Sequence, residues 1–289
     1  MMRFMTYFIG LPQWQHADWY PTTIKAPQAL QHYAQHFSAI EGNSTFYGLP
    51  KASSIQRWKE EVSDEFRFCF KFPKSISHDA KLVHCWDELE QFLQRISPLE
   101  EKIGILWLQM NQYFKPTELD RLAKFLQRLP AGFNYGIEVR HLGFFDKSEQ
   151  ERAFNRLLLE HSVNRVMFDT RLLFQNSASD SASQDARHKK PRVPLHVLAT
   201  ANTPMVRFIS PIDIDLAEAA LNQWVQKIIE WIDAGKTPYI FFHTPSNQSS
   251  PQLAQRFSQK ISKLRPDMPA LQLWSQQSPH TTPQQTHLF

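Results

Sequence analysis

Only two cysteines occur among the 289 residues, Cys69 and Cys85, and their spacing cannot form a Cys-x-x-Cys motif. Neither a disulfide framework nor a cysteine metal site can therefore be built. Long apolar runs are also missing: no stretch approaches the roughly 18 residues of a membrane span, and Pro12 follows too soon after the N-terminal MMRFMTYFI for a signal peptide. We therefore predict a protein of the reducing cytoplasm with no membrane segment.

Glycine is scarce, with 8 residues, and no Gly-x-Gly-x-x-Gly turn follows a predicted strand. The sequence thus lacks the motif with which many α/β proteins bind a nucleotide cofactor. A strong charge of one sign is absent too: 32 Lys and Arg against 28 Asp and Glu give +4, and segment 176–193 holds four Lys and Arg against two Asp. This balance permits an anionic partner but does not by itself indicate a nucleic-acid surface.

The sequence does contain a regular series of strand-like runs. Eight short runs rich in apolar, β-branched or aromatic residues start 29 to 41 residues apart. Each interval accommodates one strand and one covering helix. The runs are FMTYFI from Phe4, FSAIE from Phe37, FRFCFKF from Phe66, IGILWLQ from Ile103, NYGIEVR from Asn134, NRVMFDT from Asn164, MVRFIS from Met205 and YIFFH from Tyr239.

The intervals between these runs carry helical periodicity. Apolar residues recur at i, i+3, i+4 and i+7 within 119–126 and 221–229, for example. Eight alternations predict the α/β class and a single (β/α)8, TIM-like barrel over residues 1–274, with a doubly wound open sheet as the alternative. Two polar stretches interrupt the pattern: 175–192 after the sixth strand is predicted to be a mobile insertion, and 275–289 a flexible tail.

Every predicted strand after the first ends in a polar side chain. In a barrel, strand residues point alternately to the interior and to the helices, and active sites form at the carboxyl ends of the strands. Buried charges are costly unless they are paired or used, so we predict a functional pocket. Structural ion pairs, Glu41 with Lys71 and Glu138 with Arg140, are the alternative. The strand-end residues are Glu41, Asn43, Lys71, Gln109, Glu138, Arg140, Asp169, Arg207 and His243.

Three segments that contain these residues resemble a known family. They are IEGNSTFYGLP from Ile40 to Pro50, FRFCFKFPKSISH ending at His78, and EVRHLGFF from Glu138 to Phe145. In these segments the sequence resembles the YecE-like proteins (domain of unknown function 72), and weaker similarity covers nearly the whole chain. The resemblance implies a TIM-barrel-like fold. It implies no reaction, because the activity of the family is not established.

The first functional hypothesis is an enzyme, a hydrolase or another acid/base catalyst, that acts on an anionic, phosphorylated or nucleotide-like substrate. Glu41 and Glu138 would divide general acid and base catalysis, with Lys71 and Asp169 as further catalytic candidates. Charged and amide side chains would bind the substrate, and histidines and aromatic rings at the rim would shuttle protons or stack on a base or sugar. The substrate-binding candidates are Asn43, Tyr47, His78, Gln109, Arg140, Arg207, His243 and Trp14.

A metal-dependent form of this hypothesis stays open. Glu41, Glu138, Asp169 and His243 would then supply oxygen and imidazole ligands to a divalent cation. The sequence has twelve histidines but neither a His-x-His nor a His-Glu-x-x-His motif. No metal can therefore be named.

A second hypothesis, from another class, is a binding or recruitment protein in DNA metabolism. Residues 285–289, QTHLF, resemble the Gln-x-x-Leu-Phe motif that binds the bacterial sliding clamp. After a polar leader, Leu288 and Phe289 would enter an apolar pocket while Gln285 supplies hydrogen bonds. A sliding clamp, and with it nucleic acid, is therefore a predicted partner alongside a small anion.

Overall fold

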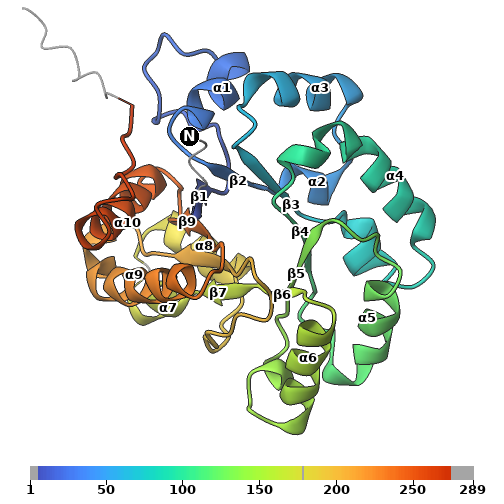
Figure 1. The fold of residues 1–289 in the computed structure, drawn as a ribbon. Helices are drawn as coiled ribbons and strands as arrows, with labels where there is room; N and C mark the ends of the chain where they lie inside the picture. Colours follow the sequence, from blue (N-terminus) through green and yellow to red (C-terminus); the bar gives the residue numbers. More distant parts are fainter. Residues whose placement is uncertain (1–5, 178, 275–289) are drawn as a thin grey trace, which may run out of the picture.

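The computed structural model describes residues 6–177 and 179–274, in which strands and helices alternate along the chain (Figure 1). Nearly all strand residues are buried, as expected for parallel strands that are covered on both faces. The strands are β1 (Phe8–Leu11), β2 (Ala39–Gly42), β3 (Arg67–Phe70), β4 (Ile105–Gln109), β5 (Asn134–Glu138), β6 (Asn164–Arg165), β7 (Met167–Asp169), β8 (Met205–Ile209) and β9 (Tyr239–His243).

The strands pair in parallel within two sheets. The six-stranded sheet has the order β3-β2-β1-β9-β8-β7, and the three-stranded sheet has the order β4-β5-β6. The register places Glu41 beside Cys69 in the first sheet and Gln109 beside Glu138 in the second. Polar residues at the carboxyl ends of neighbouring strands are thereby brought to one level. The predicted α/β class is confirmed.

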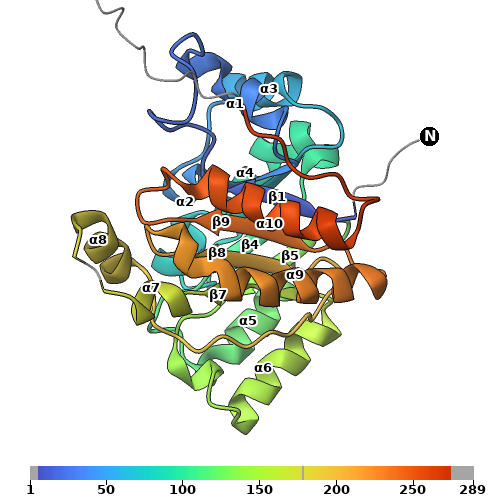
Figure 2. The same cartoon turned by 90° about the vertical axis from the view of Figure 1, so that its left-hand side faces the viewer.

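Helices cover the outer faces of the sheets. In Figure 2, α9 and α10 lie across the six-stranded sheet, and α10 contacts both β1 and β9. Helix α9 packs there because Leu221, Trp224, Val225 and Ile228 form one apolar face. The helices are α1 (Ala29–Ala34), α2 (Ser44–Tyr47), α3 (Ala52–Glu61), α4 (Trp86–Ile96), α5 (Leu119–Leu126), α6 (Glu149–Glu160), α7 (Arg171–Gln175), α8 (Ser181–Lys189), α9 (Glu218–Asp233) and α10 (Ser250–Leu264).

An apolar cluster packs between the two sheets and supports the polar strand ends. It joins residues of the six-stranded sheet to Ile105 and Trp107 of β4. Gly136 in β5 suits this close packing because it has no side chain: a Cβ there would lie 3.0 Å from Val166 Cγ2 and 3.2 Å from Trp107 Cβ. The cluster consists of Phe8, Ala39, Cys69, Ile105, Trp107, Val166, Met205, Tyr239 and Phe241.

All eight predicted runs contain strand residues. The first predicted run, from Phe4, begins before the strand: β1 spans Phe8–Leu11 and Thr6 and Tyr7 precede it, while residues 4 and 5 lie outside the described residues. The sixth run contains both β6 and β7, which are separated by Val166 alone. The positions of the strands were thus predicted to within a few residues.

The segment predicted as a polar insertion without an apolar face needs correction. Within 175–192 the chain forms α8, and the Asp180 side chain caps its N-terminus by accepting a hydrogen bond from Ser183 N at 2.7 Å. Ala186 is buried and packs in one cluster with Phe168 and Ile209. Ala186, together with the hydrogen bond from Arg187 Nε to Leu173 O at 2.9 Å, holds the helix against the strand ends. The mobility of the segment stays a prediction.

None of the helices between residues 6 and 274 that the structure describes has the length and apolar character of a membrane span. The cytoplasmic location stays a prediction, as does the assignment of 1–274 to one domain. The predicted tail, 275–289, lies outside the described residues.

Candidate active site at the strand ends

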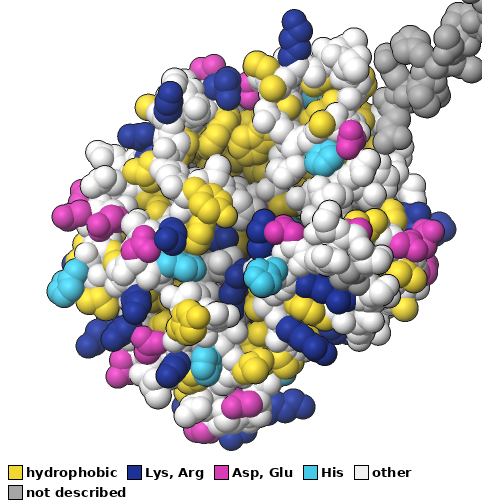
Figure 3. All heavy atoms as spheres, turned by 180° about the vertical axis from the view of Figure 1, so that it is seen from behind, with side chains coloured by type: hydrophobic (Ala, Val, Ile, Leu, Met, Phe, Trp, Pro, Cys, Tyr) yellow, Lys and Arg dark blue, Asp and Glu magenta, His cyan; other side chains and the backbone are white. Residues whose placement is uncertain are grey.

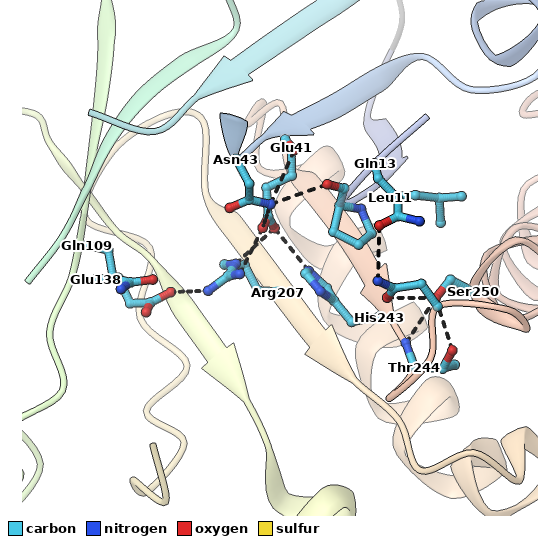
Figure 4. A network of polar contacts seen from close by, with 12 residues as sticks. Leu11, Gln13, Glu41, Asn43, Gln109, Glu138, Arg207, His243, Thr244 and Ser250 are labelled. Atoms are coloured by element: carbon cyan, nitrogen blue, oxygen red, sulfur yellow. Dashed lines mark hydrogen bonds and ion pairs between the residues drawn. The ribbon is translucent and has the colours of Figure 1, made fainter. Parts of the chain in front are cut away.

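Arg207 of β8 lies at the centre of a buried ion-pair network (Figure 4). Its Nε and Nη2 donate to the two carboxylate oxygens of Glu41 in β2, at 2.9 and 2.8 Å. Its Nη1 donates to Glu138 Oε2 in β5. A guanidinium can make these contacts together because its N–H groups form a planar fork. Arg207 therefore links the two sheets at their carboxyl ends.

On the side of the three-stranded sheet, the network continues from Glu138. Arg140 Nε donates to Glu138 Oε1 at 2.8 Å, and Arg140 Nη2 donates to Gln109 Oε1 at 2.7 Å. The three predicted residues are thus brought together. The ion pair between Glu138 and Arg140, which was predicted as a structural alternative, is present as well. The Glu138 carboxylate also binds Arg207.

On the other side, Glu41 has two further partners. Asn43 Nδ2 donates to Glu41 Oε1 at 2.8 Å, and His243 Nε2 lies 3.0 Å from Glu41 Oε2. Burial raises the pKa of Glu41, but Arg207 and His243 outweigh that effect and hold the pKa well below its ordinary range. Burial lowers the pKa of His243 to about 4. At neutral pH, Glu41 is therefore a carboxylate and His243 is uncharged.

Glu138 is ionised for the same reason. Its carboxylate is 1% exposed, and burial alone would raise its pKa, but Arg207 and Arg140 lower the pKa to about 2. Neither Glu41 nor Glu138 carries a proton that it could donate near neutral pH. Both carboxylates act as fixed negative charges that orient Arg207.

Two aromatic rings border the network, and the sequence analysis missed both. The Arg207 guanidinium lies 4.8 Å from the ring centre of Trp107 and 4.7 Å from that of Phe168. Such cation–π contacts stabilise a desolvated cation. Strand alternation was the available signal: Trp107 lies two residues before Gln109 in β4, and Phe168 lies two residues after the inner Val166.

Lys71 follows β3 and differs from the other cations of the site. It is 7% exposed, and its Nζ lies 4.2 Å from the ring centre of Phe46 and 5.1 Å from that of Trp107. Within the described part of the chain, its ammonium has no hydrogen-bond or ion-pair partner. The predicted Glu41–Lys71 ion pair is therefore wrong. Burial and the nearby Arg207 lower the pKa of Lys71 from 10.5 to about 7.

The motif from Glu41 to Phe46 explains how Lys71 is placed. Asn43 orients the Glu41 carboxylate, and the buried Thr45 hydroxyl donates to the backbone oxygen of Lys71 at 2.6 Å. The next residue, Phe46, provides the ring over which the amine lies. The conformation of the short α2 segment thus fixes the backbone and the side chain of Lys71 together.

Lys190 is a further cation of the site, and it comes from the predicted insertion. It directly follows α8 and its Nζ lies 5.7 Å from the ring centre of Phe168. Burial and Arg207 lower the pKa of Lys190 to about 8. Its ammonium has no hydrogen-bond or ion-pair partner among the residues that the structure describes. The sequence analysis recorded Lys190 as part of a basic segment but did not assign it to the site.

These residues give the site a positive excess. Arg207, Arg140, Lys190 and the protonated form of Lys71 are four cations, against the two carboxylates of Glu41 and Glu138. Figure 3 shows this face of the molecule, with Lys and Arg side chains in and around its central hollow. The alternative that the charges only close the fold does not explain why the ammonium groups of Lys71 and Lys190 have no anionic partner among the residues that the structure describes.

His78 adjoins the site at the predicted position. It lies in a single π-helical turn, Ser75–Asp79, and its ring makes an edge contact with Phe46 at 5.1 Å between ring centres. Its Nδ1 lies 2.8 Å from Ser77 Oγ. Burial and the charges of Arg140 and Lys71 lower its pKa. π-Helical turns are rare and occur frequently at functional sites.

Two aromatic candidates lie outside the network. Tyr47 is 84% exposed and lines a cavity of about 320 Å³ that shares Phe46 with the site. Trp14 packs edge-on against Trp58 of α3, with ring centres 5.3 Å apart. Tyr47 is therefore placed to contact a larger ligand, whereas Trp14 has a packing role.

Asp169 is not part of the network, contrary to prediction. Its carboxylate accepts hydrogen bonds from Arg171 Nε at 2.9 Å and from Trp224 Nε1 of α9 at 2.8 Å. Val166, just before β7, and Phe168 within it face the apolar cluster and the site, so Asp169 points to the helix layer. The predicted strand end was correct, but the predicted direction of the side chain was wrong.

The proposed metal ligands are likewise not assembled. Among the described residues, no group of three or more His, Cys, Asp or Glu side chains could hold a metal ion. Glu41 and His243 contact each other, but Arg207 lies between Glu41 and Glu138, and Asp169 points elsewhere. The predicted set of Glu41, Glu138, Asp169 and His243 is therefore wrong as a metal site.

Comparison with known proteins identifies the family. The sequence profile described as "Protein of unknown function DUF72" matches residues 8–278. The chain belongs to the DUF72 family. The resemblance to the YecE-like proteins is thereby confirmed. The chain is 44% identical to the UPF0759 protein YecE of Escherichia coli K12 over 271 residues, which cover 94% of this chain and 98% of that protein.

More distant DUF72 relatives share shorter segments or the fold. The UPF0759 protein YunF of Bacillus subtilis is 32% identical over 65 residues, 22% of this chain and 23% of that protein. Crystal structures of DUF72 proteins from Thermotoga maritima and Enterococcus faecalis superpose with TM-scores of 0.67 and 0.66, at 20% and 16% identity. Each superposition covers 89% of this chain; it covers 99% of the Thermotoga maritima chain and 96% of the Enterococcus faecalis chain. These two likenesses show the fold alone.

Proposed function

We propose that this DUF72 protein is an enzyme that binds a small anionic substrate at the carboxyl ends of its strands. The observation that supports the proposal is the pair of ammonium groups, Lys71 and Lys190, that surround the Arg207 network without anionic partners in the described part of the chain. Lys71 is buried and Lys190 is partly buried, and removing a cation from water is costly unless a counter-charge compensates it. A bound anion would supply that charge.

The electrostatics also change which residues we propose for acid/base catalysis. Glu41 and Glu138 were the first candidates, but both are ionised and hydrogen-bonded to Arg207. Lys71, with its pKa of about 7, is balanced between its acid and base forms at neutral pH. We therefore propose Lys71 as the reacting group, Arg140 and Lys190 as anion ligands, and the two carboxylates as groups that position Arg207.

Sulfate titration across pH tests the anion site, because sulfate keeps its charge over the neutral range. Affinity is expected to be highest where Lys71 and Lys190 are both protonated and to fall as pH rises through about 7 and about 8. The loss should be on the order of tenfold for each cation, since a hydrogen bond to a charged group contributes about 1.5–3 kcal/mol. Isothermal titration calorimetry at several pH values measures the effect.

Variants separate specific binding from general attraction. Lys190→Met and Arg140→Met should each weaken sulfate binding, whereas Lys124→Met, which removes an exposed lysine of α5, should leave it unchanged. If all three variants bound sulfate equally well, the cations at the strand ends would not form an anion site and the proposal would be abandoned.

We also propose that the two sheets form one (β/α)8 barrel. Two isolated parallel bridges, Phe68 to Ile103 and Lys71 to Trp107, connect β3 with β4. At the other junction, Val166, the residue that joins β6 to β7, donates its backbone N–H to Ile137 O of β5 at 2.9 Å, while β1 pairs with both β2 and β9. These contacts support closure, and active sites at the carboxyl ends are the rule in such barrels. An experimental structure with continuous β3–β4 pairing would test it.

The sliding clamp stays a second candidate partner. The motif residues Gln285, Leu288 and Phe289 lie outside the described residues and beyond 278, where the family match ends. An added recruitment motif would be expected in such a position. Deleting 285–289 should abolish binding to purified bacterial clamp in surface plasmon resonance, and Leu288→Ala with Phe289→Ala should do the same. Retention of clamp binding by either variant would exclude this motif.

A further inference from the structure

We propose that Lys71 is a nucleophile that forms an imine with the carbonyl carbon of the anionic substrate, which is then a carbonyl compound bearing a carboxylate or a phosphate. This inference rests on the proposed anion binding. It goes further, because it names the bond that forms and the chemical class of the substrate.

The amine of Lys71 is buried but chemically free. Its Nζ lies against the faces of Phe46 and Trp107, at 4.2 and 5.1 Å from the ring centres. Lys102 offers a comparison within the chain: it is equally buried, at 6% exposure against 7%, but its Nζ donates to Val62 O at 3.1 Å and to Asp64 Oδ1 at 2.6 Å. Lys102 thus has the partners of a structural lysine, and Lys71 has none among the described residues.

The surroundings of Lys71 suit a nucleophilic amine. Only the neutral form of an amine attacks a carbonyl, and apolar burial together with a neighbouring cation is the arrangement that activates a catalytic lysine. Here the rings of Phe46 and Trp107 supply the apolar surface, and Arg207 supplies the cation. Because Arg207 is fixed by two carboxylates, it stays charged while Lys71 loses its proton.

The charged neighbours determine which carbonyl compounds would bind. Arg140 and Lys190 both act electrostatically on the Arg207 network, and their remaining donors are available to a carboxylate or phosphate. An anionic group held there would orient the adjacent carbonyl carbon toward Lys71. An uncharged ketone lacks that group and is expected to react poorly.

The reaction balances without an external oxidant or reductant. The neutral amine attacks the carbonyl carbon, so that a C–N bond forms while the C=O π bond breaks, and one proton moves from the nitrogen to the oxygen to give a carbinolamine. The C–O bond then breaks, the nitrogen lone pair forms the C=N bond, and the hydroxyl leaves as water with the second nitrogen proton. We assign the proton transfers to His78, which contacts the same Phe46 ring. The net change is amine and carbonyl to imine and water.

Borohydride trapping tests the imine directly. The protein is incubated with pyruvate, with glyceraldehyde 3-phosphate or with acetone, then treated with sodium borohydride, and the modified residue is identified by peptide mass spectrometry. We expect one reduced adduct, on Lys71, from a charged compound but not from acetone. The reactive compound shows whether the anion is a carboxylate or a phosphate. Lys71→Met should lose the adduct, and sulfate should suppress it in the unchanged protein.

The outcomes distinguish the two proposals. If neither charged compound labels Lys71 while sulfate still binds with the expected pH dependence, the imine is wrong and the anion site stands. If sulfate binding and labelling are both absent, the proposed function fails. If labelling is spread over exposed lysines and Lys71→Met reduces it no more than Lys124→Met does, the reaction is nonspecific and the imine is overturned.

Discussion

Replacing Arg207 with methionine is expected to lower the free energy of unfolding by about 3–5 kcal/mol, the range found when one partner of a buried ion pair is removed. Methionine preserves much of the side-chain volume, so the loss would come from charge and not from a cavity. Glu41 and Glu138 are 0% and 1% exposed, and both depend on this guanidinium. Without it, two carboxylates would be buried near each other with fewer partners.

Urea denaturation followed by circular dichroism measures this loss. The matched control is Arg152→Met, which removes an exposed ion pair with Glu149 on α6 and should change stability little. Adding Glu41→Gln to Arg207→Met should recover part of the loss, because one unpaired charge is then removed. A decrease as small as that of the control would show that the Arg207 network does not stabilise the fold.

The polar strand ends were predictable because two simple rules act together there. Side chains alternate along a strand, and parallel strands end at the same level. These rules predict that Glu41, Glu138, Arg207 and His243 lie close together, and the structure brings their side chains into contact. The partners within the site were not predictable. The pairing of Glu41 with Arg207, and not with Lys71, depends on side-chain reach across two sheets.

Asp169 shows where the alternation rule fails. In NRVMFDT, Val166 and Phe168 are apolar on one side of the strand, but Met167 is apolar on the other. A parallel strand is buried on both faces, so hydrophobicity does not indicate which face meets the site. The aspartate at the end of the run was therefore assigned to the interior, whereas it hydrogen-bonds to Trp224 of the helix layer.

Lys190 illustrates a second limit. The polar composition of 175–192 predicts no ordered element, yet the chain forms α8 there, with a capped N-terminus, a buried Ala186 and a hydrogen bond from Arg187 to Leu173 O. The position of Lys190 then depends on how this helix packs on Phe168 and Ile209. That packing depends on contacts between residues far apart in the sequence, which cannot be predicted from periodicity or composition.

The stability of the protein is expected to rise with pH above neutrality, and Lys71 is the main reason. An unfolded lysine holds its proton up to a pKa of about 10.5, whereas folded Lys71 releases it near 7. Between these values the unfolded state binds more protons, so the free energy of unfolding rises by about 1.4 kcal/mol per pH unit. Arg207 and Arg140 favour this release, while Glu138 and Glu41 oppose it.

The contributions of Lys71 and Lys190 to stability begin at different pH values and can therefore be measured separately. Lys71→Met should abolish the rise between about pH 7 and 8, whereas Lys190→Met should keep it and flatten the curve only above about 8, since the pKa of Lys190 is about 8. Urea denaturation at closely spaced pH values, without sulfate, measures both slopes. His243 does not contribute, because its pKa of about 4 leaves it neutral throughout this range. Equal slopes for Lys71→Met and the unchanged protein would mean that Lys71 keeps its proton on folding, and it could then be neither the proposed acid/base group nor the nucleophile.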